Sequence, residues 1–210
     1  MKYLIYLLLL LCLGCNKNDK PKVEIYLLNK RIPQTEGVLF KTTSYYKNLD
    51  SIYKKWYGER YVDTIKREFI YGGKFTVVKS NLEYKPFIAD EEISSFNSQT
   101  NIIAFDSSVV SRIRKLKPSM GTGTQFVIAV NKQPIVTGYF WNILSSFTCQ
   151  SYNIVTVDPF GLDKKKTNLK HYWLGNFTDG YFPPANGKSK RPPYPPKLLE
   201  ALRQTNRLIE

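Results

Sequence analysis

The N-terminal segment constrains this 210-residue chain more than any other stretch does. Lys2 is followed by an unbroken apolar run from Tyr3 to Leu13, then by Gly14 and Cys15. A charged start, a short apolar middle and a small residue at the end are the layout of a secretory signal. The sequence therefore predicts that residues 1–14 are a signal peptide and that the rest of the chain folds outside the cytoplasm.

The end of this segment, Cys12-Leu-Gly-Cys15, resembles the lipobox of bacterial lipoproteins. In that family the last cysteine receives a diacylglycerol, the peptide is cut just before it, and the new amino group is acylated. The family usually has an aliphatic residue at the position of Cys12. The resemblance implies that Cys15 carries the lipid. Two or three acyl chains hold a protein stably at a membrane, whereas one chain holds it weakly.

Two other interpretations of the segment stay open. One is a plain secretory signal with an incidental cysteine. The other is a transmembrane helix, which needs about 20 apolar residues and so more than the run from Tyr3 to Leu13 supplies. Residues 15–22 are polar after the cysteine and are expected to form a tether. Asn16 resembles the residue found there in lipoproteins sorted to the outer membrane of Gram-negative bacteria, so we expect a cell-envelope location, with the outer membrane favoured.

The charge of the chain is strongly positive, with 31 Lys and Arg against 17 Asp and Glu, a formal net charge of +14. Such an excess attracts a protein to anionic surfaces by a nonspecific field, and it also favours solubility. In an envelope the nearest anions are lipid head groups and lipopolysaccharide phosphates, so nucleic acid is not an expected partner. A basic binder of polyanions is therefore one alternative function.

Cysteine and histidine are scarce in this chain. Cys12 would leave with the signal and Cys15 would carry lipid, so Cys149 has no intramolecular partner. Its apolar neighbours predict that it is buried; the alternative is an exposed thiol that promotes dimers. His171 is the single histidine, and no Cys-x-x-Cys or His-x-x-x-His spacing occurs. We expect no metal and no cofactor.

The secondary-structure pattern is clear from residue 86 onward. The expected elements are an extended pair at 87–88, a helical turn at 90–93, a strand at 101–105, a helix through 109–116 capped by the side chains of 106–108, a hairpin of 125–130 and 135–141, and a strand at 152–157. This order predicts an α+β domain over residues 23–160, with a small mixed or antiparallel sheet and a helix packed on one of its faces.

The preceding region is less regular. It contains an expected strand at 23–28, a helix at 50–57 ended by Gly58, and a strand at 75–78 after a Gly-Gly turn. The helical spacing puts Ile52, Trp56 and Tyr57 near one face. The remainder of residues 30–85 shows no clear pattern.

The stretch from residue 87 to 157 resembles the head of the first periplasmic domain of the export-motor subunit SecD. The resemblance follows the acidic turn at 90–93, the strand ending in Asp106, the strand Phe126-Val-Ile-Ala-Val130 and the entry into its partner at 133–136. It implies a soluble envelope domain that contacts other proteins. The SecD family carries several transmembrane helices, which this chain lacks after its signal, so motor function and functional-site residues are not implied.

The C-terminal part, residues 161–210, is predicted to be a loop- and Pro-rich extension. Residues 171–174 are amphipathic and expected to pack on the domain. The run Arg191-Pro-Pro-Tyr-Pro-Pro196 favours a polyproline II spacer or surface strap, because readers of Pro-x-x-Pro are not expected in a bacterial envelope. Residues 197–210 are expected to form a closing helix.

No group of residues predicts catalysis. The loop 121–124 lacks the third glycine and the following helix of a nucleotide loop. A serine nucleophile would depend on His171, and no Gly-x-Ser-x-Gly occurs. The carboxylates at 90–92 could serve acid/base chemistry, although a helix start explains them. The aromatic residues 139–141 could stack on a sugar or base, but we expect one or two of them in the core and the rest on the sheet surface.

The leading functional hypothesis is a non-enzymatic, lipid-anchored envelope protein that acts by protein or surface contacts. The alternatives are an envelope hydrolase or carbohydrate-handling enzyme with scattered carboxylates, and the basic polyanion binder. The expected partners are the membrane, through the lipid on Cys15, and other envelope proteins or anionic lipid and lipopolysaccharide.

Overall fold

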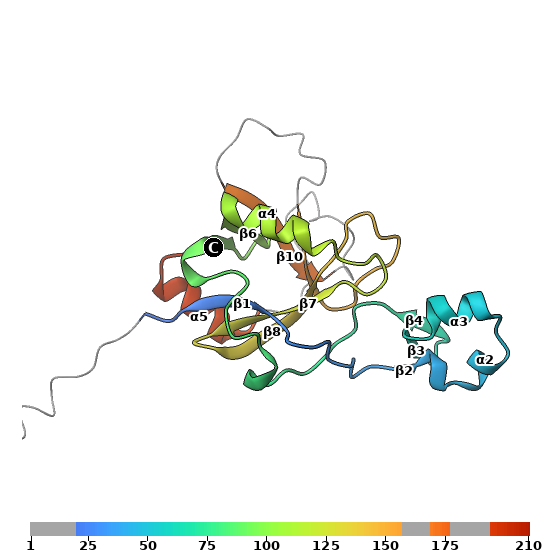
Figure 1. Ribbon diagram of the computed structural model, residues 1–210. Helices are drawn as coiled ribbons and strands as arrows, with labels where there is room; N and C mark the ends of the chain where they lie inside the picture. The colour runs from blue at the N-terminus through green and yellow to red at the C-terminus, as the bar shows by residue number, and fades with distance from the viewer. Residues whose placement is uncertain (1–19, 157–168, 177–193) are drawn as a thin grey trace, which may run out of the picture.

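The computed structural model of the chain describes residues 20–156, 169–176 and 194–210 (Figure 1). The predicted signal peptide, Cys15 and residues 191–193 of the proline run lie outside these ranges. None of the helices in the described ranges has the length and apolar character that crossing a membrane requires.

An eight-stranded mixed sheet forms the body of the protein (Figure 1). Its spatial order is β1 (Val23–Leu27), β7 (Thr124–Val130), β8 (Gln133–Phe140), β9 (Tyr152–Thr156), β10 (Leu169–Asn176), β6 (Ile102–Asp106), β5 (Ile93–Asn97) and β11 (Leu208–Ile209). The β8–β9 and β5–β11 pairs are parallel and the other pairs antiparallel. The predicted α+β class and the order strand, helix, hairpin, strand over 102–156 are confirmed.

Two helices contribute to the larger core of the sheet. α4 (Ser107–Leu116) supplies Val109, and α5 (Pro196–Gln204) supplies Leu198 and Leu202, to the buried cluster that contains Phe126 and Ile128 of β7. Burying each such side chain stabilises the fold by about 1.5–3 kcal/mol. The helix predicted on one face of the sheet is therefore confirmed, and α5 joins the same cluster.

The start of α4 differs in one detail from the prediction. The helix begins after Asp106, but the Asp106 carboxylate makes no capping hydrogen bond. It accepts a hydrogen bond from the Ser94 hydroxyl of β5 at 3.2 Å. Lys117, with a left-handed φ of 43°, and Pro118 follow the last turn. The expected helix end is thus confirmed, whereas Asp106 connects the helix start to the neighbouring strand.

The opposite face of the sheet carries a second core cluster, which includes Tyr139, Trp141 and Trp173. Phe75 and Cys149, from irregular segments, complete it, so the predicted burial of Cys149 is confirmed. Both faces of the sheet are covered, and for this reason Tyr139, Phe140 and Trp141 are all buried. The expectation that some of these three aromatic residues lie on the surface was wrong.

Residues 75–78, predicted as a strand, have irregular backbone instead. The Thr137 hydroxyl donates to the Phe75 carbonyl at 3.2 Å, and the Phe75 ring packs edge-on against Tyr139 with centroids 5.3 Å apart. Contacts with the side chains of β8 therefore fix this segment on the sheet, and the predicted strand is not formed.

The C-terminal residues belong to the body. β10, which contains the amphipathic residues 171–174, pairs with β9 on one side and β6 on the other. α5 ends at Gln204, because Asn206 has a left-handed φ of 55° and the Arg207 N–H donates to the Leu202 carbonyl at 2.8 Å. Leu208 then pairs with β5. The closing helix is therefore shorter than predicted, and a strand follows it.

Candidate functional site

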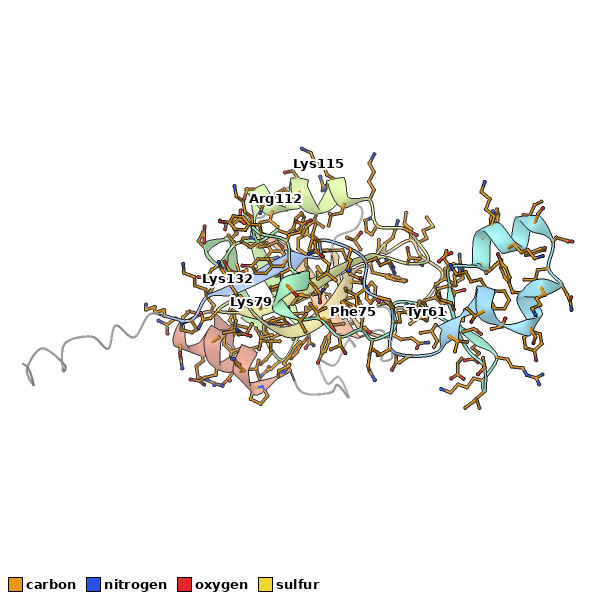
Figure 2. All side chains as sticks on the ribbon, turned by 60° about the horizontal axis from the view of Figure 1, so that its bottom comes forward. Tyr61, Phe75, Lys79, Arg112, Lys115 and Lys132 are labelled. Carbon is orange, nitrogen blue, oxygen red and sulfur yellow. The ribbon has the colours of Figure 1, made fainter. Side chains whose placement is uncertain are left out.

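Residues 38–70 form a lobe that projects from the body (Figure 1). It contains an antiparallel sheet of β2 (Val38–Leu39), β3 (Tyr61–Asp63) and β4 (Glu68–Ile70), with the short helices η1 (Phe40–Thr42), α2 (Ser44–Lys47) and α3 (Ser51–Tyr57). In Figures 1 and 2 the lobe lies at the end of the molecule opposite to the one where the N-terminal segment enters. The lobe and the start of the described chain therefore lie at opposite ends of the molecule.

Two chain segments, residues 32–37 and 71–75, connect the lobe to the body. The Thr35 N–H and hydroxyl both donate to the Lys74 carbonyl, at 2.8 and 3.1 Å. Gly37 turns the chain into the lobe with a φ of +71°, and a Cβ there would lie 2.6 Å from the Val62 carbonyl oxygen. The connection is thus a paired stalk whose turn requires glycine.

Aromatic ring contacts stabilise the interior of the lobe. Phe69 lies at its centre, edge-on to Phe40 at 5.0 Å and stacked on Tyr57 at 5.2 Å between centroids. Val62 and Ile70 are the large apolar side chains of residues 38–70 that are buried. Each aromatic pair contributes about 0.5–1.5 kcal/mol beyond its burial. The lobe is therefore held mainly by rings that are only partly buried.

Arg60 joins the lobe to the body. Its guanidinium carbon lies 4.8 Å from the ring centroid of Tyr57, 5.3 Å from that of Tyr71 and 5.1 Å from that of Phe147. The guanidinium also donates to the Tyr71 hydroxyl at 3.0 Å and to the Trp56 carbonyl at 3.1 Å. Cation–π contacts of this kind contribute about 0.5–2 kcal/mol each. We call Arg60, Tyr71 and Phe147 the seam, because they bridge the lobe, the stalk and the body.

The outer surface of α3 exposes large apolar side chains. Ile52, Tyr53 and Trp56 are 64%, 52% and 65% exposed. Their spacing places them within an arc of about 100° on the helix. The predicted common face of Ile52, Trp56 and Tyr57 is therefore confirmed only in part. Ile52 and Trp56 point to solvent, whereas the half-buried Tyr57 stacks on Phe69 inside the lobe. We call Ile52, Tyr53 and Trp56 the tip patch.

The tip patch is unusual for this protein. Of the eleven large apolar residues of the described chain that are strongly exposed, six lie in the lobe: Val38, Tyr45, Ile52, Tyr53, Trp56 and Ile65. Tryptophan is highly buried on average in folded proteins. Contiguous exposed apolar surface marks interaction sites. The tip patch is therefore the candidate functional surface.

The charge of the lobe is positive. Residues 38–70 contain seven Lys and Arg and four Asp and Glu, a formal net charge of 7 − 4 = +3. Lys41 pairs with Glu59 at 2.6 Å, and the Lys54 ammonium donates to the Lys47 carbonyl at 3.0 Å. Lys47 and Lys55 are exposed. The apolar tip patch is thus accompanied by exposed ammonium groups on α2 and α3.

Two of the three acidic residues considered for acid/base chemistry, Asp90 and Glu92, have structural partners, whereas Glu91 is exposed. The Asp90 carboxylate pairs with Arg207 at 2.5 Å and accepts from the Val23 N–H at 2.6 Å. Glu92 pairs with Arg112 at 2.7 Å. Burial alone would raise the pKa of Glu92, but hydrogen bonds from Arg112 and the Ala89 N–H outweigh it and lower that pKa. Both carboxylates therefore tie η3 (Asp90–Glu92) to neighbouring elements.

The loop 121–124 lies at the start of β7, as predicted. The Arg31 guanidinium donates to the carbonyls of Thr122 and Gly123 at 2.8 and 3.2 Å. Arg31 and Thr124 also line an open pocket of about 230 Å³ on the body, together with Leu27, Leu28, Lys30, Glu83, Gly123 and Gln125. Gln125 is already bound to both main-chain groups of Ile32. The pocket contains one carboxylate and is smaller than typical ligand cavities.

The two remaining candidate residues, Cys149 and His171, differ in their exposure. Cys149 is fully buried, and this burial raises the pKa of its thiol to about 12. His171 is exposed on β10. Within the described ranges, no three His, Cys, Asp or Glu side chains are arranged to hold a metal ion.

Comparison of this chain with protein-family models, with curated proteins and with solved structures gives no significant match.

Sequence reasoning placed no site in the lobe, because residues 30–85 lack long periodic segments. One signal was present. Eight of the 33 residues in the stretch 38–70 are aromatic, against 14% in the whole chain. Aromatic enrichment without helical or strand periodicity is therefore the feature that could have drawn attention to this stretch.

Proposed function

We propose that this chain is a lipid-anchored protein of the bacterial cell envelope that acts through contacts made by its projecting lobe, without catalysing a reaction. The observation that carries this proposal is the exposure of Ile52, Tyr53 and Trp56 at the end of the molecule opposite to the entering N-terminal segment. Exposing such side chains to water is unfavourable unless a partner covers them.

The proposed anchor is a lipid on Cys15, with the outer membrane as the favoured location. Four residues lie between Cys15 and Lys20, so the five steps along this part of the chain span at most about 18 Å. The Lys22 N–H donates to the Asn131 side chain at 2.8 Å, and the Asn131 N–H donates to the Lys22 carbonyl at 2.9 Å. Because the chain is attached to the body from Lys22 onward, the tether would keep this end of the body close to the membrane.

The proposed lack of catalysis is supported by the placement of the candidate acid/base groups. Arg207 and Arg112 bind Asp90 and Glu92, respectively, so both carboxylates have structural partners. The resemblance of residues 87–157 to the SecD head suggests a body that contacts other envelope proteins.

Membrane fractionation tests the anchor. Cys15→Ala should move the protein from the membrane fraction to the soluble fraction. Cys149→Ala is the matched control and should stay in the membrane fraction, because Cys149 is buried. Persistent membrane residence of Cys15→Ala would overturn the lipid anchor.

Site-specific photo-crosslinking in intact cells tests the contact surface. A photoreactive phenylalanine analogue at Ile52 should give adducts with an envelope component. The same analogue at Tyr84, a 93% exposed position on the body, should give far fewer. Equal adduct yields from the two positions would contradict a specific contact by the lobe.

A second candidate function, binding of polyanions, is favoured by the outer face of α4. Arg114 and Lys115 are exposed on α4 and Lys117 is exposed just after it, and Figure 2 shows Lys115 on the side of the helix away from the body. Binding to lipopolysaccharide should weaken steeply with salt. An Arg114→Gln, Lys115→Gln double variant should reduce this salt dependence, and an unchanged dependence would remove α4 as the binding surface.

A further inference from the structure

We propose that the tip patch inserts into the interface of an anionic lipid bilayer, with Trp56 as its principal anchor. This inference rests on the proposed function for the role of the lobe as the contact surface, and it names the partner as the membrane itself.

The composition of the tip patch fits a membrane interface. Trp and Tyr concentrate at the head-group level of bilayers, because their rings are apolar while the indole N–H and phenol hydroxyl reach polar groups. Ile52 and Trp56 are four residues apart, so they lie one above the other on the outer side of α3, with Tyr53 beside them. A short helix surface of this kind can bury its apolar side chains at the boundary between head groups and acyl chains.

The shape of the lobe also favours a bilayer. Small molecules bind in concave sites. The side chains of the tip patch are exposed on α3 of the projecting lobe, whose place Figure 1 shows. The pocket lined by Leu27 and Arg31 lies on the body. A sugar would meet the aliphatic Ile52 with its hydroxyl groups, whereas an acyl chain meets Ile52 without losing hydrogen bonds. The apolar content of the patch therefore matches lipid better than a glycan.

The charge around the patch selects anionic lipid. Lys47 and Lys55 are exposed on α2 and α3, and the lobe carries a formal net charge of +3. A lysine near an anionic membrane surface strengthens binding by about fivefold. Ammonium groups beside apolar side chains can stay at the head groups while the rings enter.

The two ends of the molecule would then both contact lipid. The N-terminal segment enters at one end and the lobe lies at the other (Figures 1 and 2). A tether through Cys15 raises the effective concentration of the lobe at the bilayer, so weak insertion by three side chains is sufficient. The body would lie along the membrane surface.

Tryptophan fluorescence provides a direct test, because the chain has three tryptophans and two are buried. Trp141 and Trp173 are 4% and 2% exposed, whereas Trp56 is 65% exposed. The full-length protein is reconstituted with its own anchor into vesicles of phosphatidylethanolamine and brominated phosphatidylglycerol. We expect the bromine atoms to quench the Trp56 emission, and acrylamide to lose access to it. Protein that is bound to vesicles but unquenched, with Trp56 open to acrylamide, would overturn the proposal.

Variants assign the signal to the tip patch. Trp56→Phe should remove the quenchable component. Lys55→Gln should weaken insertion by about fivefold, because one ammonium near the anionic surface is lost. Tyr84→Ser removes an exposed aromatic side chain from the body and should leave quenching unchanged. Quenching that persists in Trp56→Phe would contradict insertion of the lobe.

The two proposals fail in different ways. Co-sedimentation with the vesicles that is lost in Cys15→Ala reports attachment through Cys15, while quenching reports the tip patch alone. Protein that sediments with the vesicles but is not quenched would contradict insertion of the lobe and would still be consistent with the lipid anchor. Emission of Trp56 that responds to added lipopolysaccharide carbohydrate and not to brominated lipid would assign the patch to a glycan and overturn the bilayer.

Discussion

The rings of Tyr71 and Phe147 stack with centroids 4.1 Å apart and planes inclined by 11°. Tyr71 lies in the stalk of the lobe, and Phe147 lies in the irregular segment that follows β8 and covers the sheet. The adjacent Gln150 N–H donates to the Tyr71 carbonyl at 2.9 Å. The stalk of the lobe is thus joined to the body by an aromatic stack and a main-chain hydrogen bond.

Replacing Phe147 should loosen the lobe selectively. Phe147→Ala removes both the stack with Tyr71 and the cation–π contact with Arg60, which together contribute about 1–3 kcal/mol. Amide hydrogen exchange in residues 38–70 should therefore accelerate by about 10- to 100-fold, while exchange in β7 and β8 stays unchanged. Tyr84→Ala is the control, since Tyr84 is exposed. Uniform acceleration across the whole protein would show that the seam is not specific to the lobe.

Arg207 is predicted to be important for global stability. Its guanidinium donates to the Asp90 carboxylate and to the Asp90 carbonyl, both at 2.5 Å, and its side chain is 11% exposed. Arg207→Ala would leave the Asp90 carboxylate without this partner, so the free energy of unfolding should fall by about 2–4 kcal/mol. Urea denaturation measures this change.

Arg203 supplies the matched control for Arg207. It pairs with Glu200 and Glu210, but all three side chains are more than half exposed. Solvent screens ion pairs as exposed as these, so Arg203→Ala should lower the free energy of unfolding much less than Arg207→Ala. An equal fall in the free energy of unfolding in Arg203→Ala and Arg207→Ala would mean that burial of the ion pair does not determine its contribution.

The Glu92 ion pair should make stability depend on pH. The pKa of Glu92 is lowered in the folded protein from its ordinary value of 4.5, because the hydrogen bonds from Arg112 and Ala89 outweigh the effect of burial. Its contribution is therefore fully present above about pH 4.5 and is lost as the pH falls through the folded pKa. Glu92→Gln should be less stable than the native protein by about 1 kcal/mol at pH 7, and this difference should shrink toward pH 3.

Urea denaturation at several pH values measures the Glu92 effect. The control introduces Glu92→Gln into an Arg112→Ala background, where the largest source of stabilisation of the carboxylate is already missing. The pH dependence of the difference should then be much smaller. A difference that persists at pH 3 would indicate a steric effect of the substitution.

Cys149 should be chemically inert in the folded protein. Burial raises the pKa of its thiol to about 12, and the thiolate is the reactive form. Iodoacetamide at pH 8 should leave Cys149 unmodified in native protein and modify it rapidly in urea, as measured by peptide mass spectrometry. Modification of native protein at the rate of a free thiol would support the alternative of an exposed cysteine that promotes dimers.

The fold was most predictable where contacts are local. Val109, Val110 and Ile113 recur at helical spacing, and the apolar strand ending at Val130 is followed by a polar turn. These patterns predicted α4 and the β7–β8 hairpin, because turn chemistry and periodicity act within a few residues. They could not predict that β10 lies between β9 and β6, since pairing of strands distant in the chain leaves no local mark.

The candidate site was less predictable than the fold. Helical spacing put Ile52, Trp56 and Tyr57 near one side of α3. This was correct for Ile52 and Trp56, but Tyr57 turns toward Phe69, and periodicity does not say whether a side meets a core or solvent. The same limit explains why the burial of both Tyr139 and Trp141 was not predicted. Alternation along the strand shows that Tyr139 and Trp141 point to the same face of the sheet. The residues that cover this face, Phe75 and Cys149, lie in irregular segments whose position the sequence pattern does not predict.

Patterns among neighbouring residues were sufficient to predict the α+β class and the order of elements from β6 to β9. The expectation of a lipid on Cys15 also comes from the sequence and stays a prediction. That residues 38–70 project as a lobe, and that the apolar side of α3 faces outward, became visible only in the folded structure. This is because burial depends on which distant segments cover a surface, as the packing of Cys149 against Phe75 and Trp173 also shows. No segment of the described chain covers the tip patch.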